Sequence, residues 1–478
     1  MALSNYRLTQ IARMARLTHT ELTDRHREIL DFSFTYYEKN KVGPLYLTLK
    51  KHLGLAREEL DRLFPHGLNS LYTWTGIPIQ TTEETCKPPA QLNVPDFQEV
   101  YLDHNATTYL RHEVVEVLHD YHEGRLGFAN PSSGTQPGQA AFNLVQQARE
   151  TLAECLETSA EQVLFTSCGT EANNMVIKGL GLNALLRGQR PHFVCSTLEH
   201  ASVLEPHHWL EELGAEITWV KPDSQGRVSP QALIDALTER TVLVSLMAAN
   251  NEIGTLEPVL DAAAILAPRK VPLLVDAVQA LGKVPLYPER WGVTYMSFSA
   301  HKIYGPKGIG ALYHAPGAPL FPLLSGGGQE AGWRSGTENV GYILAFAHSV
   351  RLACQEQERE QERLRSLRDE FLEGLRRIEP GLRVNGSLEH RLAGNLSIAF
   401  PRVDTGSLLL SLNNIGVYVS AGSACSTGKI QNSHVLEAIG ADTDNFGTIR
   451  FSLGLRTRAE NLAYVLKYLP EILRQIRD

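Results

Sequence analysis

From residue 100 onward the sequence alternates between short apolar runs and longer amphipathic stretches, and this alternation limits the possible folds. The apolar runs VLFTS (residues 163–167), HFVCS, EITWV, VLVSLMAA and PLLVDAV have the length and composition of buried strands. Between them we expect helices, for example over residues 137–155 and from Glu171 to about Leu186. Strands that alternate with helices form a mostly parallel sheet covered on both faces. We therefore expect an α/β fold, with a large domain over residues 100–350 and a smaller α+β domain over residues 351–478.

The first part of the chain differs and is typical of a small helical domain over residues 1–86. The spacing of its apolar residues predicts helices over residues 22–40, 45–53 and 57–63, the first with an N-cap candidate at Thr23. Residues 87–99 are polar and rich in proline, as is typical of a linker, so we place the domain boundary there. A further helix, with many charges that face solvent, is expected after Cys354.

Composition excludes several classes of protein. The 478 residues carry a formal net charge of −8, which argues against bulk binding of nucleic acid. No apolar run approaches the ~18 residues of a membrane span, and the first residues lack the apolar core of a signal peptide. The six cysteines have no CxxC spacing. We therefore expect reduced thiols in a cytoplasmic protein, with neither a disulfide framework nor a metal site.

One lysine occupies an unusual position. The run YMSFS predicts a buried strand, and Lys302 follows it directly, after Ser299 and His301 and before a turn rich in glycine and proline. Burial lowers the pKa of a lysine, and a neutral amine can condense with a carbonyl group. A lone lysine in a turn is more often a surface residue. Here other stretches supply the groups that a bound aldehyde cofactor needs.

Three of those stretches also follow predicted strands. Gly169-Thr170 opens a helix after VLFTS, which gives free N–H groups and a helix dipole for an anion such as a phosphate. Asp276 ends PLLVD, with Gln279 three residues on, and a buried carboxylate there needs a cationic partner. A protonated pyridine nitrogen is one such partner, because it keeps pyridoxal phosphate (PLP) an electron sink. A helix-capping Asp276 and a structural His200 are the alternatives.

The last part of the chain holds two further candidates. Cys425 lies in SAGSACSTG, a stretch rich in small residues where a thiol is accessible. Arg450 lies in the apolar run TIRFSLG, so its guanidinium needs an anion. A substrate carboxylate is a natural bidentate partner for it.

These motifs together resemble those of PLP-dependent cysteine desulfurases of the NifS/IscS type, which have the fold-type-I aminotransferase fold. The resemblance runs from about residue 100 to the C-terminus. It is carried, in order, by YLDHNATT, NPSS, FTSCGTEANN, EHASV, ANNEIGT, DAVQALGK, SFSAHKIYGPKGIG, GGGQEAGWRSGTEN, SAGSACSTG and IRFSLG. Two positions depart from the family pattern: Thr135 stands where the family usually has histidine, and Cys168 where it has glycine.

The resemblance implies specific roles in the reaction. Lys302 would carry PLP through its amine, and His200 would stack on the ring and act in catalysis. Cys425 would be the nucleophile that takes the sulfur of L-cysteine as a persulfide, and Arg450 would bind the cysteine carboxylate. The length of the segment around Cys425 resembles the class whose catalytic cysteine can reach an acceptor protein.

The resemblance also implies how PLP is held. Asp276 would pair with the pyridine nitrogen and Gln279 would hydrogen-bond the ring hydroxyl, while Asn250 would line both cofactor and substrate. The phosphate would be bound by Gly169, Thr170, Ser299 and His301, joined by Thr337 from the partner subunit of a homodimer.

The N-terminal domain resembles the DsrC/TusE sulfur-carrier family in LTDRHREILDFSFTYYEKN, GPLYLTLKKHLG, LDRLFPHG and TGIPIQ. That family carries persulfide on a cysteine shortly after a GLP turn. Gly76-Ile77-Pro78 matches the turn and Cys86 follows it, three residues later than in the family, so Cys86 is a possible sulfur carrier. An inert linker cysteine is the alternative. Tyr72 stands where the DsrC branch has a second cysteine, which favours the TusE-like branch.

We therefore predict a cysteine desulfurase that passes sulfur to an acceptor for iron–sulfur cluster assembly or tRNA thiolation. The alternatives are a selenocysteine lyase, another PLP enzyme of the class-V aminotransferases, or a dimeric platform for the carrier domain.

Overall fold

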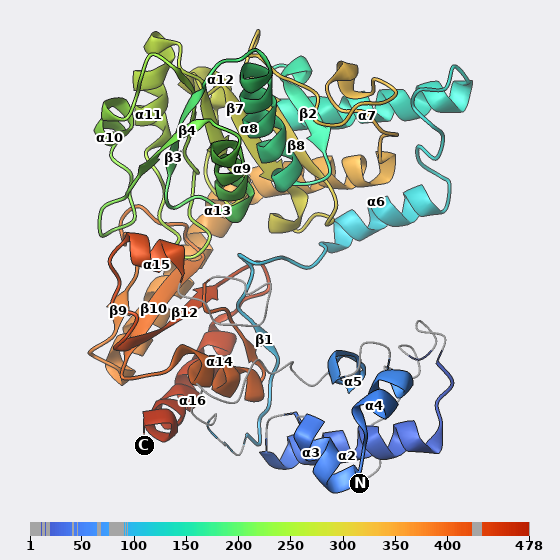
Figure 1. Cartoon of the computed structure of the whole chain (residues 1–478), viewed down its shortest axis with the longest axis vertical. Coiled ribbons are helices and arrows are strands. Elements are labelled where there is room, and N and C mark those ends of the chain that lie inside the picture. Colours follow the sequence, from blue (N-terminus) through green and yellow to red (C-terminus); the bar gives the residue numbers. More distant parts are fainter. Residues whose placement is uncertain are drawn as a thin grey trace. The chain divides into compact units, whose positions relative to one another are not determined.

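The computed structural model describes residues 20–40, 43–44, 46–64, 68–75, 94–422 and 433–477, together with Ile11, Ala15, Ala90 and Leu92. The chain divides into two compact units, an N-terminal unit up to residue 91 and a main unit that begins at Leu92 (Figure 1). Cys86 and Cys425 lie outside the described residues.

The N-terminal unit is helical where it is described. It holds α2 (Asp24–Asn40), α3 (Tyr46–Leu53), α4 (Arg57–Leu63) and α5 (Leu68–Thr75). Thr23 caps α2 as predicted, since its Oγ1 accepts from the backbone N–H of His26. His26 itself is buried between Phe64 and Trp74, and its Nε2 lies 2.8 Å from the carbonyl oxygen of Leu63. His26 is therefore a polar residue within an aromatic core, and both of its ring nitrogens have hydrogen-bond partners.

The main unit is built on a seven-stranded sheet in the order β2-β8-β7-β6-β5-β3-β4. Only β8 runs antiparallel to its neighbours, which confirms the mostly parallel sheet predicted from the sequence. The strands are β2 (Val163–Thr166), β3 (His192–Ser196), β4 (Glu216–Val220), β5 (Thr241–Ser245), β6 (Leu273–Asp276), β7 (Tyr295–Ser299) and β8 (Gly310–His314).

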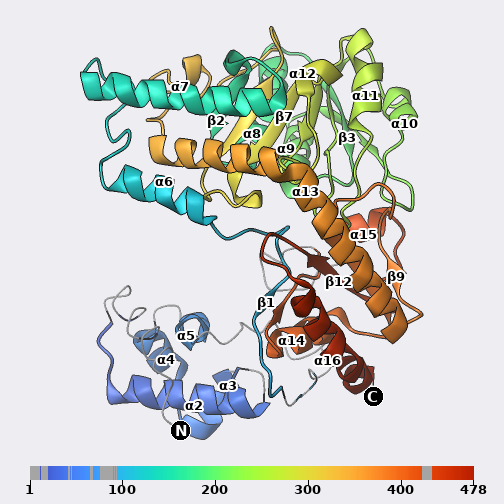
Figure 2. The ribbon, with the colours of Figure 1, turned by 180° about the vertical axis from the view of Figure 1, so that it is seen from behind.

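Helices cover both faces of this sheet because side chains along each strand point alternately to either side. Leu164, Phe193 and Leu274 pack with α8 (Gly169–Leu186) and α9 (Ala201–Glu212) on one face. Their neighbours Phe165 and Val194 pack with α7 (Gln136–Leu156), α11 (Val259–Leu266) and α13 (Val340–Ile378) on the other, as the two opposite views show (Figure 2). The remaining helices of this part are α6 (His112–His122), α10 (Pro230–Asp235) and α12 (Pro288–Trp291).

The long helix α13 leads from the seven-stranded sheet to a smaller α+β part (Figure 2). The predicted boundary between residues 350 and 351 falls within this helix. The smaller part has an antiparallel sheet in the order β12-β10-β9 and a parallel pair, β1 and β11. Its elements are β1 (Val100–Tyr101), β9 (Arg383–Val384), β10 (Asn395–Pro401), α14 (Thr405–Asn414), β11 (Val417–Tyr418), α15 (His434–Ala438), β12 (Phe446–Ser452) and α16 (Ala459–Arg477). Among the described residues, no helix combines the length and the apolar character needed to cross a membrane.

Candidate active site

Lys302 lies where the chain leaves β7. A 3₁₀ turn, Ala300–Lys302, follows the strand directly and turns the lysine into the interior. Its Nζ donates to the carbonyl oxygens of Asn105 and Ala106, both at 2.7 Å. Burial lowers the pKa of this amine to about 8; Arg450 lowers it further, while Asp103 and Asp276 act in the opposite direction. A lysine with this pKa presents its nucleophilic neutral form much more often at neutral pH than a solvated lysine does.

Asp276, at the end of the neighbouring strand β6, is linked to His200 by two side chains. Asn173, fully buried on α8, donates from Nδ2 to Asp276 Oδ2 at 2.8 Å and to Ser202 Oγ at 3.0 Å. Ser202 Oγ in turn lies 2.9 Å from His200 Nδ1. A second donor, the backbone N–H of Val278, fixes Asp276 Oδ1 at 3.0 Å. The carboxylate is therefore held in a set orientation and connected to the histidine.

The same contacts define the protonation state of His200. The backbone N–H of Ser202 donates to His200 Nδ1 at 3.0 Å, and an N–H group can only donate. The neutral ring therefore carries its proton on Nε2. Burial lowers the pKa of His200 and keeps the ring neutral, with Lys302 and His434 adding to the effect and Asp276 opposing it.

The start of α8 and the end of β7 meet beside Lys302. Gly169, the first residue of α8, is buried, and a Cβ at this position would lie 2.5 Å from Val278 Cγ2 and 3.8 Å from Ser299 Cβ. Glycine is therefore required for this close approach. Thr170 is exposed in the same helical turn. His301 lies in the 3₁₀ turn with its Nδ1 at 3.1 Å from Thr107 Oγ1, and burial lowers its pKa to about 4. The four residues predicted to hold a phosphate thus belong to two segments that lie side by side.

Gln279 is fixed by two partners of opposite character. Lys283 Nζ donates to its Oε1 at 3.0 Å, and its Nε2 donates to the carbonyl oxygen of Asn105 at 2.8 Å. An ammonium only donates and a carbonyl only accepts, so the orientation of the amide is determined. Burial lowers the pKa of Lys283 to about 7, with Lys302 and Arg450 adding to the effect. Lys283 and Lys302 both line a cavity of about 60 Å³ between the large and small parts of the main unit.

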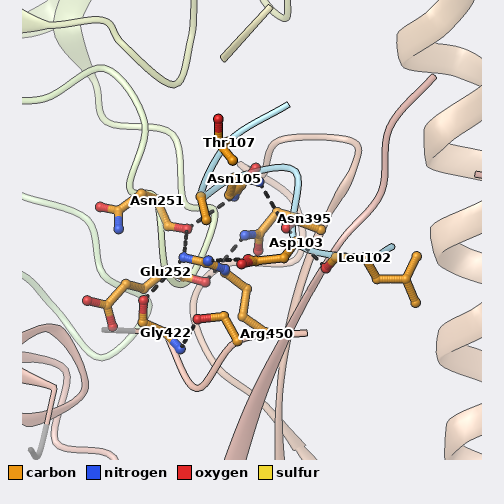
Figure 3. A network of polar contacts seen from close by, with 12 residues as sticks. Leu102, Asp103, Asn105, Thr107, Asn251, Glu252, Asn395, Gly422 and Arg450 are labelled. Atoms are coloured by element: carbon orange, nitrogen blue, oxygen red, sulfur yellow. Dashed lines mark hydrogen bonds and ion pairs between the residues drawn. The ribbon is translucent and has the colours of Figure 1, made fainter. Parts of the chain in front are cut away.

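Arg450 lies in the middle of β12 and is 2% exposed. The sequence predicted an anionic partner, and the protein itself provides one: Nη2 donates to Asp103 Oδ1 at 2.6 Å (Figure 3). Nη1 donates to the carbonyl oxygens of Asn251 at 3.0 Å and Gly422 at 3.2 Å. Arg450 thus has an internal counter-ion in addition to any substrate carboxylate.

Asn250 and Thr337 occupy different environments. Asn250 is fully buried, and its Oδ1 accepts from the backbone N–H groups of Glu252 and Ile253 while its Nδ2 donates to the carbonyl of Leu198. Its side chain therefore shapes the turn that presents the Asn251 carbonyl to Arg450. Thr337 is exposed, next to Gly336, whose φ of 113° is a conformation that glycine adopts readily.

Gly422 and Ser433 are the described residues nearest to Cys425 in the sequence. The carbonyl of Gly422 accepts from Arg450, and Ser433 Oγ donates to the buried carboxylate of Glu252 at 2.5 Å.

Thr135, one of the two departures from the family pattern, caps α7, since its Oγ1 accepts from Gly138 N–H at 3.3 Å. Among the described residues, no group of three or more histidine, cysteine or acidic side chains could hold a metal ion.

The comparison with known proteins agrees with this geometry. A model of the family described as aminotransferase class-V matches residues 100–465. The chain belongs to this family. A relative named cysteine desulfurase IscS, from Dictyoglomus turgidum, is 42% identical over 381 residues, which cover 80% of this chain and 96% of that protein. A relative named cysteine desulfurase, mitochondrial, from Arabidopsis thaliana, is 38% identical over 385 residues, 79% of this chain and 83% of that protein.

Solved structures show the same fold. A structure described as a NifS-like protein superimposes with a TM-score of 0.73 at 36% identity, covering 79% of this chain and 100% of that chain. A NifS-like protein from Rickettsia africae superimposes with a TM-score of 0.70 at 27% identity, covering 79% of this chain and 100% of the other. The family match begins at residue 100, so the N-terminal unit lies outside it.

The cofactor of the family is pyridoxal 5′-phosphate, and the described residues fit it. Lys302 offers an amine of lowered pKa, and Asp276 offers a buried carboxylate for the pyridine nitrogen. The α8 N-terminus, beside Ser299, offers donors to a phosphate in a cradle that a Cβ on Gly169 would fill.

Sequence reasoning missed five residues of the site: Asp103, Asn105, Asn173, Ser202 and Lys283. All five lie in motifs that carry the family resemblance, so their positions were flagged but their roles were not. Lys283 and Ser202 contact Gln279 and His200 nearby in the chain. The partners of Asp103, Asn105 and Asn173 are far away in the chain; Asp103 and Arg450, for example, are 347 positions apart. No local pattern reveals a pairing of this kind.

Proposed function

We propose that the chain is a PLP-dependent cysteine desulfurase that converts L-cysteine to L-alanine and leaves a persulfide on Cys425. One observation carries the proposal: a buried amine of lowered pKa, Lys302, is surrounded by the buried carboxylate of Asp276 and the buried guanidinium of Arg450. A reaction of an amino acid with PLP needs an amine to carry the cofactor, a carboxylate to keep the pyridine nitrogen protonated, and a cation to bind the substrate carboxylate. Relatives named cysteine desulfurase, up to 42% identical to the chain, support the choice of cysteine as the substrate.

The chain's own residues divide the work. When bound, PLP supplies an electron sink for the substrate Cα, and Asp276 favours the protonated pyridine nitrogen on which that sink depends. Lys302 moves the proton at Cα, for which a pKa of about 8 is well suited. His200 presents Nε2–H to the site, and its ring is fixed by Ser202. Gln279 would donate from Nε2 to the ring hydroxyl, and Gly169, Thr170, Ser299 and His301 would hold the phosphate.

Sulfur transfer balances without an added oxidant. The Cys425 thiolate attacks the substrate sulfur, an S–S bond forms, and the Cβ–S bond of the substrate breaks with its electron pair left on Cβ. A proton at Cβ and the return of the proton at Cα then complete alanine. The thiolate is required because the thiol is a poor nucleophile.

We further propose a cytoplasmic homodimer in which Thr337 completes the phosphate site of the partner subunit. A sulfur-acceptor protein, for iron–sulfur cluster assembly or tRNA thiolation, takes the persulfide sulfur. The N-terminal unit acts as a TusE-like carrier, with Cys86 as its sulfur-bearing residue. The carrier role is supported by the motif pattern of the N-terminal unit and by its helical core, to which α2, α4 and α5 contribute.

The test is to supply L-cysteine with a thiol reductant and quantify alanine and sulfide. Equal amounts of both are expected. Lys302→Ala should lower turnover more than ~1,000-fold, about 4 kcal/mol of barrier. Cys425→Ser should keep the PLP absorbance but release no sulfide, whereas Cys354→Ser, a control on α13, should behave as wild type.

Several results would overturn the proposal. Keto-acid formation in place of alanine would identify an aminotransferase, and strong preference for selenocysteine would identify a selenocysteine lyase. Absence of PLP absorbance would favour the alternative that the main unit is a dimeric platform for the N-terminal unit.

A further inference from the structure

Arg450 and Asp103 form a pair of opposite charges at the substrate end of the site. The guanidinium is 2% exposed and the carboxylate 22% exposed, so Asp103 is the partner that reaches toward open space. The backbone around Asp103 is fixed: it bridges to Ser452 on β12, and the next residue, His104, donates its N–H to the Ser452 carbonyl at 3.2 Å. The carboxylate therefore cannot move far from the guanidinium.

The hydrogen bonds to the described residues do not use all the donors of Arg450. Three hydrogen bonds engage its Nη atoms, and its buried Nε has no hydrogen-bond partner among the described residues (Figure 3). A guanidinium has five N–H donors, so two remain, the number that a carboxylate takes in a bidentate contact. A carboxylate that binds there meets the attraction of Arg450 together with the repulsion of Asp103.

An amino acid differs from a simple acid in this field. It carries an ammonium next to its carboxylate, and its amine must reach the cofactor held by Lys302. Arg450 lowers the pKa of Lys302 more than Asp103 raises it, so Arg450 repels an ammonium at that position and Asp103 offsets part of this repulsion. Asp103 therefore favours the ammonium of a zwitterion while it repels the carboxylate of a lone anion.

We propose that Asp103 is a specificity-determining residue that makes the site select zwitterionic amino acids over simple carboxylates. The proposal rests on the proposed function, because it takes Arg450 as the receptor of the substrate carboxylate. Asp103 also limits how tightly the carboxylate of the product is held, which favours release. Discrimination of this kind needs a repulsive element as well as an attractive one.

Propionate and L-alanine are the matched probes, because they differ only in the α-ammonium. Their Kd values are measured by calorimetry on the holoprotein and on the cofactor-free protein, where no covalent step contributes. Asp103→Asn keeps an oxygen near Arg450 Nη2 but removes the charge. We expect propionate to bind about fivefold tighter or better in this variant, with a smaller change for L-alanine.

Two further variants separate the possible outcomes. Asp96→Asn removes a carboxylate that pairs with Lys467, so it makes the same change in net charge and should leave both Kd values unchanged. Arg450→Ala should weaken both ligands; retained binding in that variant refutes Arg450 as the receptor of the carboxylate, on which the proposed function and the present proposal both rest. Unchanged or weaker propionate binding in folded Asp103→Asn overturns the present proposal, and Asp103→Ser provides the same test if the first variant does not fold.

Discussion

Replacing Lys302 with methionine should change how the stability of the cofactor-free protein depends on pH. The folded state lowers the pKa of this amine from 10.5 to about 8, mainly through burial. Below pH 8 both the folded and the unfolded states are protonated, and the folded state bears the full penalty of a buried ammonium. Between pH 8 and 10.5 the unfolded state binds more protons, so stability rises with pH in this window.

The size of the effect follows from the same values. Each unit of difference in pKa corresponds to about 1.4 kcal/mol, so the penalty near pH 7 is about 3 kcal/mol. By pH 10 most of it is relieved, and the linkage relation leaves about 1 kcal/mol. The methionine variant has no such term. Its lost hydrogen bonds to Asn105 and Ala106 change the offset between the two proteins and not its dependence on pH.

The assay is urea unfolding of both cofactor-free proteins at pH 7, 8, 9 and 10, followed by tryptophan fluorescence. The free energy of unfolding of wild type minus that of Lys302→Met should rise by about 2 kcal/mol between pH 7 and pH 10. Groups that do not interact with Lys302 cancel in this difference. Lys283, His200 and His301 are the exceptions, because the charge of Lys302 lowers their pKa values. Lys178→Met, which removes an ammonium over the Trp209 ring, controls for the general loss of a lysine. Two parallel pH curves would refute the buried, lowered pKa of Lys302.

Two other predictions concern the cofactor site and the N-terminal unit. Asn173→Ala removes a donor from Asp276 Oδ2 and from Ser202 Oγ, so the Kd for PLP should rise about tenfold, as measured by fluorescence titration, while Asn174→Ala in the same helix should change it less. If Cys86 is a carrier, mass spectrometry after L-cysteine addition should find persulfide on Cys425 first and on Cys86 later; label that never reaches Cys86 would leave the N-terminal unit a docking module.

The positions of Lys302, Asp276 and Gly169 in the proposed site could be predicted because all three lie at the ends of strands of one sheet. Asp276 is the last residue of β6, and Lys302 and Gly169 lie three residues beyond the ends of β7 and β2. The carboxyl ends of parallel strands lie at the same edge, so residues at these positions meet even when they are distant in sequence. A pattern of buried strands therefore carries information about the site as well as about the fold.

The start of α13 was missed for a different reason. The prediction placed a charged helix after Cys354, guided by the run QEQEREQ, but the helix begins at Val340. In its first turns, the residues that pack against α7 and the sheet are apolar. Ile343, Phe346 and Val350 are buried there. A buried helical segment of this kind cannot be distinguished from a strand by its apolar residues alone.

The partner of Arg450 could not have been found by any of these rules. Asp103 follows β1, which has only two residues and gives no strand pattern in the sequence. The arginine was recognised as a cation in need of an anion because it interrupts an apolar strand, but physical reasoning about one segment cannot say where the anion comes from.

In the proposed function, the charges of the site couple substrate binding to the protonation of Lys302. Arg450 lowers the pKa of Lys302, and Asp103 raises it, so the amine responds to the net charge at the substrate end. A substrate carboxylate at Arg450 adds a negative charge there and raises the affinity of Lys302 for a proton. Binding free energies are reciprocal, so a protonated Lys302 also holds the carboxylate more tightly. Lys302 therefore accepts a proton most readily while the substrate is bound, and it releases its hold on the product carboxylate when it gives the proton up.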